Sequence, residues 1–372
     1  MFLLLVVSLI IDIIMELNTQ YTDPVRRFWI DDNQPQWEIL EGELSYYVRN
    51  NCKLLGHDII DVDVSNDKVA FSKAIYLGNF INIWGHCITD NLKRLWFLKP
   101  SLGKDMLSQG YKMVCTLLKN NKFNDNFVKL LRYLDIDADA ITIVQDGTCF
   151  ETLIIPDKSL SEGHHYYKEY KELIDKIRAQ IPYKIDSPKK VYFSRARLNN
   201  GRDFGEKNVE NVFRMLGYDI FYPEDVPLEE QLTILKSCDS FAATEGSISH
   251  NVMFCRDGVE CVIIRKTVSL NGYQFSANRM RDVNATFIDA HLSLFRIFDD
   301  SYGPFFLYRN QNLVNYANDK GLKLRVSFPR WTFIRYCMQT VWLMLRFRIK
   351  PKLIKRDPDF YWKRLRSDFF AQ

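Results

Sequence analysis

Two side chains that can exchange a proton, His86 and Asp90, stand four residues apart in a stretch with helical apolar spacing. On a helix over 84–98 they would share one face with Arg94, and the apolar side chains would form a separate stripe. A carboxylate one turn from an imidazole fixes its tautomer and raises its basicity, which suits removal of a proton from a hydroxyl. The alternative is a His/Asp pair that caps or solvates an amphipathic helix.

Either member of this pair can be the proton acceptor. Asp90 is favoured, with His86 as its hydrogen-bonding neighbour, because an aspartate is already deprotonated at neutral pH. The reverse assignment, with His86 as the base and Asp90 as the group that orients it, fits nearly as well. Glu245 is the next choice if neither residue takes the proton.

A second group of residues suits a bound anion. Arg195 and Arg197 follow a short apolar strand, and Arg202 comes shortly after. Guanidinium groups pair bidentately with phosphate oxygens, so arginines at the carboxyl end of a strand can hold a diphosphate.

The segment 243–251 reads as a strand, a glycine turn and a helix start, a geometry that can aim backbone N–H groups at an anion. Glu245 is placed to hydrogen-bond ribose hydroxyls or a sugar. An ordinary strand-to-helix turn, with Ser247 or Ser249 as N-cap, is the alternative. The residues expected to bind the anion and its attached groups are Arg195, Arg197, Arg202, Glu245, Gly246, Ser247, His250 and Asn251.

Several other chemistries lack their sequence signatures. Neither G-x-G-x-x-G nor G-x-x-x-x-G-K-[S/T] occurs, which argues against dinucleotide redox chemistry and P-loop hydrolysis. Eight cysteines show no C-x-x-C and no zinc-ligand spacing, as expected of reduced thiols in a cytoplasmic protein. A net charge of +4 is too small to indicate a nucleic-acid partner.

Three acidic doublets match the D-x-D pattern that metal-using enzymes employ to hold a cation on a diphosphate. Three matches in an acidic-rich chain of this length are near chance, and none stands beside the arginines or the glycine turn. We therefore expect no metal site and no cofactor. The doublets are Asp61/Asp63, Asp135/Asp137 and Asp357/Asp359.

The elements that must position these residues alternate between strand and helix, which is the α/β signature. A proline-containing polar segment at 181–190 reads as a linker, after which the alternation restarts. Strands are expected at 69–77, 111–117, 141–144, 152–155, 191–193, 218–221, 239–244 and 259–264. Helices are expected at 84–98, 126–134, 166–177, 209–216, from 227, and at 249–254.

The fold class expected from this pattern is α/β, with two Rossmann-like domains that face a cleft. Four parts of the chain are expected: an apolar N-terminal segment, a first and a second Rossmann-like domain, and a basic C-terminal helical segment. Their ranges are 1–25, 26–185, 186–300 and 301–372.

Together these residues resemble glycosyltransferase family 61, in the family's order and approximate spacing from Val69 to Lys266. The motifs are Asn79-Phe80, Trp84-Gly85-His86, Asp90-Asn91, Arg94-Leu95, Ser194-Arg195, Arg202, Glu206, Glu224, Glu230-Gln231, Gly246-Ser247, Asn251 and Phe254. The resemblance implies an inverting GT-B-type transferase of a bacterial-like kind. Its acceptor would lie mainly in the first half and its nucleotide sugar in the second.

Two departures from many plant and animal members lie in the expected donor half. The sequence Glu245-Gly246-Ser247 stands where those members have His-Gly-Ala, and Gly205 stands where an asparagine often precedes the glutamate. The expected activity is transfer of a hexosyl or pentosyl group from a nucleotide sugar to a glycan or lipid-linked glycan, in surface polysaccharide biosynthesis and without a metal. The alternatives are a nucleotide-sugar epimerase of similar architecture and a non-catalytic membrane-associated scaffold.

The two ends of the chain raise the question of a membrane. Met1 to Met15 is almost wholly apolar but shorter than the ~20 residues of a spanning helix, so we interpret it as a weak anchor or as a start codon placed too early. From Trp331 to Arg356 there are seven Lys or Arg and no acidic residue, among tryptophans and aliphatic residues. This pattern favours a peripheral helix on an anionic membrane, at the inner face in a cytoplasmic enzyme. The alternative is a helix that packs back across the first domain.

Overall fold

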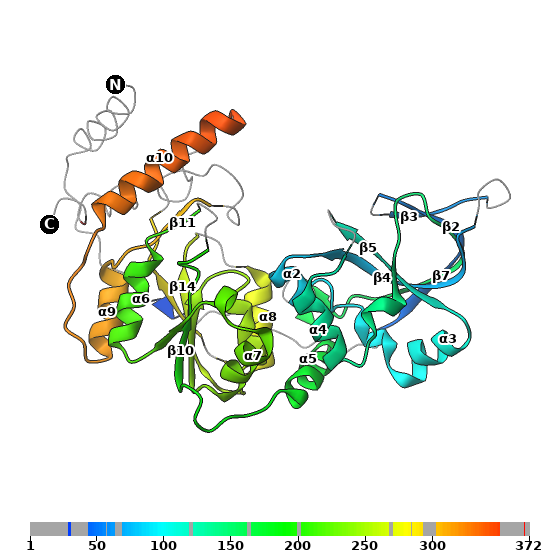
Figure 1. The fold of residues 1–372 in the computed structure, drawn as a ribbon, viewed down its shortest axis with the longest axis horizontal. Coiled ribbons are helices and arrows are strands. Elements are labelled where there is room, and N and C mark those ends of the chain that lie inside the picture. The colour runs from blue at the N-terminus through cyan, green and yellow to red at the C-terminus, as the bar shows by residue number, and fades with distance from the viewer. Residues whose placement is uncertain are drawn as a thin grey trace.

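The computed structural model describes residues 29–30, 44–56, 58–63, 69–118, 122–161, 165–198, 202–267, 271–283, 285–292, 303–349 and 368. Two six-stranded sheets organise these residues into two α/β halves that lie side by side (Figure 1). The helices α2, α4 and α5 of the first half face α7 and α8 of the second (Figure 1). The predicted acidic doublet Asp357/Asp359 lies outside the described residues.

The first sheet is mixed, with the strand order β3-β2-β7-β4-β5-β6. The strands β7, β4, β5 and β6 run parallel, whereas β2 is antiparallel to both β7 and β3. Its strands are β2 Tyr46–Leu55, β3 Asp58–Asp61, β4 Phe71–Ile81, β5 Lys112–Leu118, β6 Ile141–Ile143 and β7 Cys149–Pro156. A short hairpin of β8 Leu160–Ser161 and β9 His165–Tyr166 follows.

Helices and helical turns connect the strands of the first half. They are α2 Trp84–Ile88, η1 Leu95–Leu98, η2 Pro100–Lys104, α3 Asp105–Ser108, α4 Asp125–Tyr133, η3 Ala138–Ala140 and α5 Lys168–Gln180. The helix predicted over 84–98 was wrong in its length, because α2 ends at Ile88 and a turn follows. The residues 181–189, predicted as part of a linker, contain no helix or strand.

The second sheet has the order β1-β15-β14-β13-β10-β12, in which β1 alone is antiparallel. The chain starts at β10, adds β12 on one side, and then crosses to β13 on the other side. This is the topological switch point of a doubly wound sheet, where ligands bind at the carboxyl ends of the strands. The strands are β1 Trp29–Ile30, β10 Lys190–Phe193, β12 Asp219–Phe221, β13 Ser240–Thr244, β14 Glu260–Arg265 and β15 Ala285–Asp289.

Helices cover both faces of the second sheet (Figure 1). The helices α6 and α9 pack in an apolar cluster on one face, and α7, η5 and α8 pack on the other. That second cluster continues into the first half, so the two halves share buried apolar contacts. The elements are α6 Glu206–Met215, η4 Pro223–Asp225, α7 Leu228–Ser237, η5 Ser249–Phe254, α8 Gly272–Met280 and α9 Gln311–Asp319.

The C-terminal segment predicted at 301–372 is partly built into the second half. Its helix α9 contributes Leu313, Tyr316 and Ala317 to the core beside α6. A long helix, α10 Arg330–Phe347, then packs on the small sheet of β11 Asp203–Phe204 and β16 Phe305–Phe306. The alternative position across the first domain is therefore wrong. Of the described helices, none combines the length and the apolar character needed to cross a membrane.

Candidate active site

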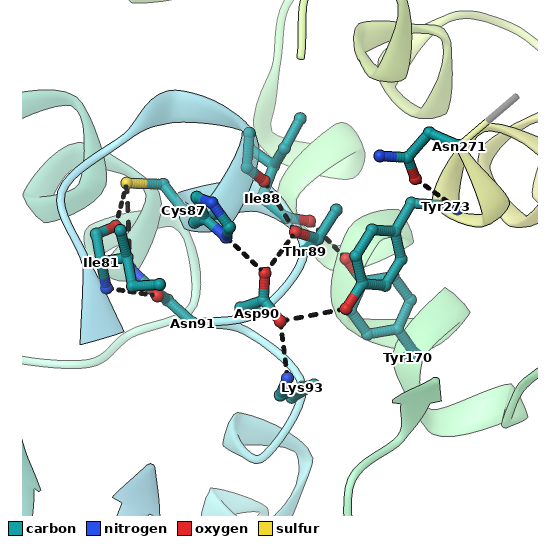
Figure 2. Close-up of polar contacts among 12 residues, drawn as sticks. Ile81, Cys87, Ile88, Thr89, Asp90, Asn91, Lys93, Tyr170, Asn271 and Tyr273 are labelled. Atoms are coloured by element: carbon teal, nitrogen blue, oxygen red, sulfur yellow. Dashed lines mark hydrogen bonds and ion pairs between the residues drawn. The ribbon is translucent and has the colours of Figure 1, made fainter. Parts of the chain in front are cut away.

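The helix α2 begins three residues after β4 ends, so it lies at the carboxyl edge of the first sheet. Asn91 fixes the chain after this helix to the end of the strand. Its Oδ1 accepts a hydrogen bond from the Ile81 N–H at 3.0 Å, and its Nδ2 donates to the Ile81 carbonyl at 3.2 Å. Tyr170 donates from its buried hydroxyl to the Ile88 carbonyl (Figure 2). These bonds replace a helical continuation and hold the segment in one place.

His86 and Asp90 form the contact that their spacing predicts, with 2.7 Å between Nδ1 and Oδ2. Three further donors surround the same carboxylate (Figure 2). Its Oδ1 accepts from Lys93 Nζ at 2.6 Å and from the Tyr273 hydroxyl at 3.0 Å. Its Oδ2 lies 3.2 Å from the hydroxyl of Thr89.

These contacts determine what each member of the pair can do. Burial raises the pKa of Asp90, but hydrogen bonds from His86 and Lys93 outweigh it and hold the pKa well below its ordinary value. Asp90 is therefore a weak proton acceptor. Because an ionised carboxylate only accepts, the Nδ1 of His86 carries the hydrogen and Nε2 is left as a lone pair. The His86 side chain is 42% exposed, so a substrate can reach it.

Three contacts join this site to the second half. Tyr273, at the start of α8, supplies the hydroxyl on Asp90. The indole Nε1 of Trp84 donates to Oδ1 of Asn251 at 2.8 Å. A Cβ added at Gly85 would come within 2.4 Å of the Ser247 hydroxyl oxygen, so only glycine fits there without a shift. Both halves therefore contribute to the surroundings of His86 in α2 and of Asp90 in the turn that follows it.

His250 lies beneath the same site. Its side chain is buried, and burial lowers its pKa to about 4. Its ring meets that of Tyr273 edge to face at a centroid distance of 6.4 Å. Within the described part of the chain, neither of its ring nitrogens forms a hydrogen bond. His250 is therefore a neutral, buried imidazole next to the pair.

A cluster of buried charges lies at the carboxyl edge of the second sheet. Arg195 follows β10 and Lys266 follows β14, and both approach the same carboxylate, that of Asp203 in β11. The ion-pair distances are 3.7 Å from Arg195 Nη2 and 3.7 Å from Lys266 Nζ. Both are longer than a charge-assisted hydrogen bond. Two cations therefore approach this carboxylate without a short contact, and the carboxyl groups of Glu206 and Glu245 lie near the same cations.

Two buried carboxyl groups complete this edge. Burial raises the pKa of Glu206 to about 7, although the Arg195 N–H donates to it at 3.1 Å. Burial also raises the pKa of Glu245, whose Oε2 lies 3.3 Å from the Thr267 hydroxyl. Glu206 receives a second bond, from Tyr192 at 3.1 Å. Burial therefore disfavours the charged form of both carboxyl groups, compared with carboxyl groups at the surface.

Arg197 and Gly246, which were also predicted to bind the anion, have other partners in the structure. Arg197 pairs with Asp225 and lies over the Tyr222 ring, 3.7 Å from its centroid, with its side chain 56% exposed. Arg202 is exposed next to Asp203. The Gly246 N–H donates to the Ser249 hydroxyl at 3.1 Å, so this donor of the glycine turn is already engaged. Gly246 has a φ of 120°, which favours glycine.

Arg94 does not share a face with His86 and Asp90. It is half-buried beside Gly78 and Tyr76, because the turn after Ile88 carries it back over β4. Among the acidic doublets, Asp61 in β3 pairs with Arg49, and Asp135 pairs with Lys176 at 2.7 Å. A pocket of about 470 Å³ lies between the residues 184–188 and α7, and none of the predicted site residues lines it.

Sequence reasoning missed Lys266 and Tyr273. Lys266 follows a buried apolar strand directly, as Arg195 does, and this position was a usable signal. Tyr273 meets Asp90 across 183 residues of sequence, and no local motif marks it.

Comparison with known proteins identifies the family of one part of the chain. Residues 84–264 match the family model described as Glycosyltransferase 61, from the first residue of α2 into β14, so that Lys266 and Tyr273 lie beyond the matched range. A search of curated proteins gives no match to the chain. Residues 84–264 are therefore a glycosyltransferase family 61 domain, and the chain is a glycosyltransferase.

Proposed function

We propose that this enzyme is an inverting transferase of the GT-B type, which moves a hexosyl or pentosyl group from a nucleotide sugar to a hydroxyl of a glycan acceptor. The acceptor lies at the carboxyl edge of the first sheet, and the nucleotide diphosphate lies at that of the second. The observation that carries the proposal is the arrangement of an imidazole/carboxylate pair and a cation cluster on two sheet edges that are joined by Trp84, Gly85 and Tyr273.

In the proposed reaction, the acceptor hydroxyl attacks the anomeric carbon opposite the diphosphate. His86 Nε2 takes its proton as the new carbon–oxygen bond forms, and Asp90 stabilises the imidazolium that results. This reverses the assignment favoured from the sequence. It is supported by the four donors on Asp90, which make that carboxylate a weaker base than a free one.

As the bond to the sugar breaks, negative charge grows on the departing nucleoside diphosphate. Arg195 and Lys266 are proposed to bind that charge, since both cations lie at this edge and approach Asp203 only to 3.7 Å. Glu245 remains the proposed contact for the ribose or the sugar. On this account the charge comes from side chains, and turnover survives EDTA. Loss of turnover on chelation, restored by manganese or magnesium, would overturn this part of the proposal.

The enzyme is proposed to act in the cytoplasm on a glycan or lipid-linked glycan of a surface polysaccharide. All eight cysteines are free and seven are buried, which supports a reducing compartment. The basic stretch near the C-terminus supports an acceptor at a membrane surface.

A thermal-shift screen against nucleoside diphosphates tests the donor site directly. A ligand bound only by the native state raises its stability, by about 2.7 kcal/mol at a hundred times Kd. We expect one diphosphate to stabilise the wild type and to stabilise Lys266→Met much less. The control is Lys320→Met, which removes an exposed lysine paired with Glu260 at 2.6 Å. A scaffold would bind none of them.

Incubation with the matching nucleotide sugar and no acceptor separates transfer from epimerisation. A transferase hydrolyses the donor slowly at most and leaves the sugar configuration unchanged. Appearance of an epimer of the sugar would show the alternative activity, and would overturn the proposed role of His86 toward an acceptor.

A further inference from the structure

The helix α10 has a well-packed inward face. Phe333, Tyr336, Thr340 and Leu343 are buried along it. The Phe333 ring lies 5.3 Å from that of Phe306 and 5.2 Å from that of Phe328. This face follows the spacing expected of an amphipathic helix on a core, and it accounts for the position of α10 over β11 and β16 (Figure 1).

A second set of large side chains lies on the opposite side of the same helix. They recur at i, i+4, i+7, i+11 and i+14, which is also the spacing of one helical face. Four of them are apolar or aromatic, with exposed fractions of 82%, 46%, 47% and 69% for Trp331, Met338, Trp342 and Leu345. We call this set the outward face of α10: Trp331, Arg335, Met338, Trp342 and Leu345.

The charge on this face has one sign. No Asp or Glu occurs from Arg330 to Phe347, and Arg335 and Arg346 are exposed. The Arg346 guanidinium lies over the Trp342 ring, 4.9 Å from its centroid. Among the residues that the structure describes, no carboxylate forms an ion pair with Arg335 or Arg346. A surface of exposed tryptophans and arginines is complementary to an apolar phase that carries anionic headgroups.

We propose that the outward face of α10 binds an anionic lipid bilayer, with its tryptophans and Leu345 at the acyl boundary and its arginines among the phosphates. Peripheral helices have this composition, since their apolar face inserts and their cations meet the lipid charge. A protein partner of ordinary composition would need acidic groups opposite the arginines and a pocket for each tryptophan. An anionic bilayer offers phosphates to the arginines and an acyl region to the tryptophans along the whole helix.

This position would bring the donor edge close to the membrane. The Tyr336 ring of α10 meets the Phe204 ring of β11 at 6.0 Å, and Asp203 is the neighbouring residue of the same strand. Asp203 is the carboxylate that Arg195 and Lys266 share. Binding of lipid needs none of the proposed transfer chemistry, so this inference stands or fails separately from it.

Co-sedimentation of the full chain with vesicles tests the proposal. The probes are phosphatidylcholine vesicles with and without phosphatidylglycerol. We expect the wild type to bind the anionic vesicles, and to be released by rising salt because its cations are screened. Arg335→Gln with Arg346→Gln is expected to weaken partitioning roughly 30-fold. The matched control makes the same change of charge at exposed lysines elsewhere, Lys112→Gln with Lys207→Gln.

A second variant removes the apolar part of the outward face, through Trp331→Ser, Trp342→Ser and Leu345→Ser. We expect it to lose anionic-vesicle binding by roughly tenfold or more. Its matched control is Tyr47→Ser, Leu55→Ser and Ile185→Ser, whose wild-type side chains are 62%, 51% and 76% exposed on other elements. Every variant keeps residues 1–28, so any contribution of that segment is common to all.

Three outcomes would overturn the proposal. The first is absence of wild-type binding to anionic vesicles. The second is equal binding by the α10 variants and their controls. The third is a wild-type dimer that the serine variant converts to a monomer, which would show that a second copy covers this face. If the serine variant fails to fold by circular dichroism, the arginine pair decides, because its side chains are exposed.

Discussion

The two sheet edges differ in how tightly their charges are held. On the first edge, Asp90 accepts from four donors at 2.6 to 3.2 Å, and one imidazole nitrogen is left for chemistry. On the second edge, Arg195 and Lys266 approach Asp203 only to 3.7 Å. The groups of the first edge are therefore held in one orientation by short hydrogen bonds. The cations of the second edge are paired only at long distance.

The difference in contact distances indicates which chemical task each sheet edge suits. Short hydrogen bonds fix an orientation, which proton transfer requires. Buried cations with long contacts keep part of their charge uncompensated, which favours an incoming anion. Mutations of the His86/Asp90 pair and of the cation cluster are therefore expected to have different kinetic effects. Substitutions on the first edge should affect kcat, and those on the second should affect binding as well.

The largest effect is expected for His86→Gln. Removal of a proton acceptor costs about 100- to 10,000-fold in turnover, and the nucleotide-sugar KM should stay near normal because the donor lies on the other edge. Steady-state kinetics measure both. His165→Gln is the matched control, since that histidine is exposed in the β8–β9 hairpin.

A contrary result would relocate the base. If His86→Gln and Asp90→Asn both keep near-normal turnover in folded protein, neither member of the pair takes the proton. Glu245 would then be the next residue to test, because its buried carboxyl has a raised pKa.

Arg195→Ala should have the next largest effect, at roughly 2–4 kcal/mol in the barrier with weaker nucleoside diphosphate binding. Arg197→Ala is its control within the same sequence motif. Because Arg197 already pairs with Asp225 and stacks on Tyr222, we expect its loss to change turnover little. Equal losses from the two variants would mean that Arg197 also binds the diphosphate, and that the donor site extends beyond the cations next to Asp203.

The strand–helix alternation could be predicted from the sequence, and so could the contact between His86 and Asp90. Both depend on local periodicity, which reports burial directly. The strands β10, β12, β13 and β14 were predicted to within a residue because they are short, apolar runs bounded by turns, whereas β15 was missed. The strand β2 was missed, since seven of its ten residues are exposed and the first six of them show no alternation.

What the sequence could not supply were contacts between distant segments. The helix after Trp84 was predicted too long because Tyr170 bonds to the Ile88 carbonyl, which a longer helix would use, and Asn91 bonds back to Ile81 at the end of β4. Tyr273 was missed for a similar reason, as its partner Asp90 lies in the other half. The arginine motif was predicted as a unit, whereas Arg195 turns toward Asp203 and Arg197 pairs with Asp225.

Tyr273→Phe removes the hydrogen bond that Tyr273 of the second half donates to Asp90 of the first half. The loss of a hydrogen bond to a buried carboxylate is worth about 1 kcal/mol, so kcat should fall roughly two- to tenfold. The nucleotide-sugar KM should stay unchanged, which a general loss of structure would not produce. Unchanged kcat would show that the contact to Asp90 only joins the halves.

The smallest effect concerns pH on the second edge. The pKa of Glu206 is raised to about 7 by burial, so the carboxyl is neutral below that pH and negative above it. Since Glu206 bonds to the backbone of Arg195, its negative form opposes a diphosphate at the same place. Affinity for a nucleotide sugar should therefore fall as pH rises from 6 to 8, by roughly threefold for a repulsion of about 0.7 kcal/mol. The nucleotide sugar is the right probe because its diphosphate does not titrate in this range. Calorimetry on Glu206→Gln should give a flat profile, and a variant that keeps the wild-type slope would assign the pH dependence to another group.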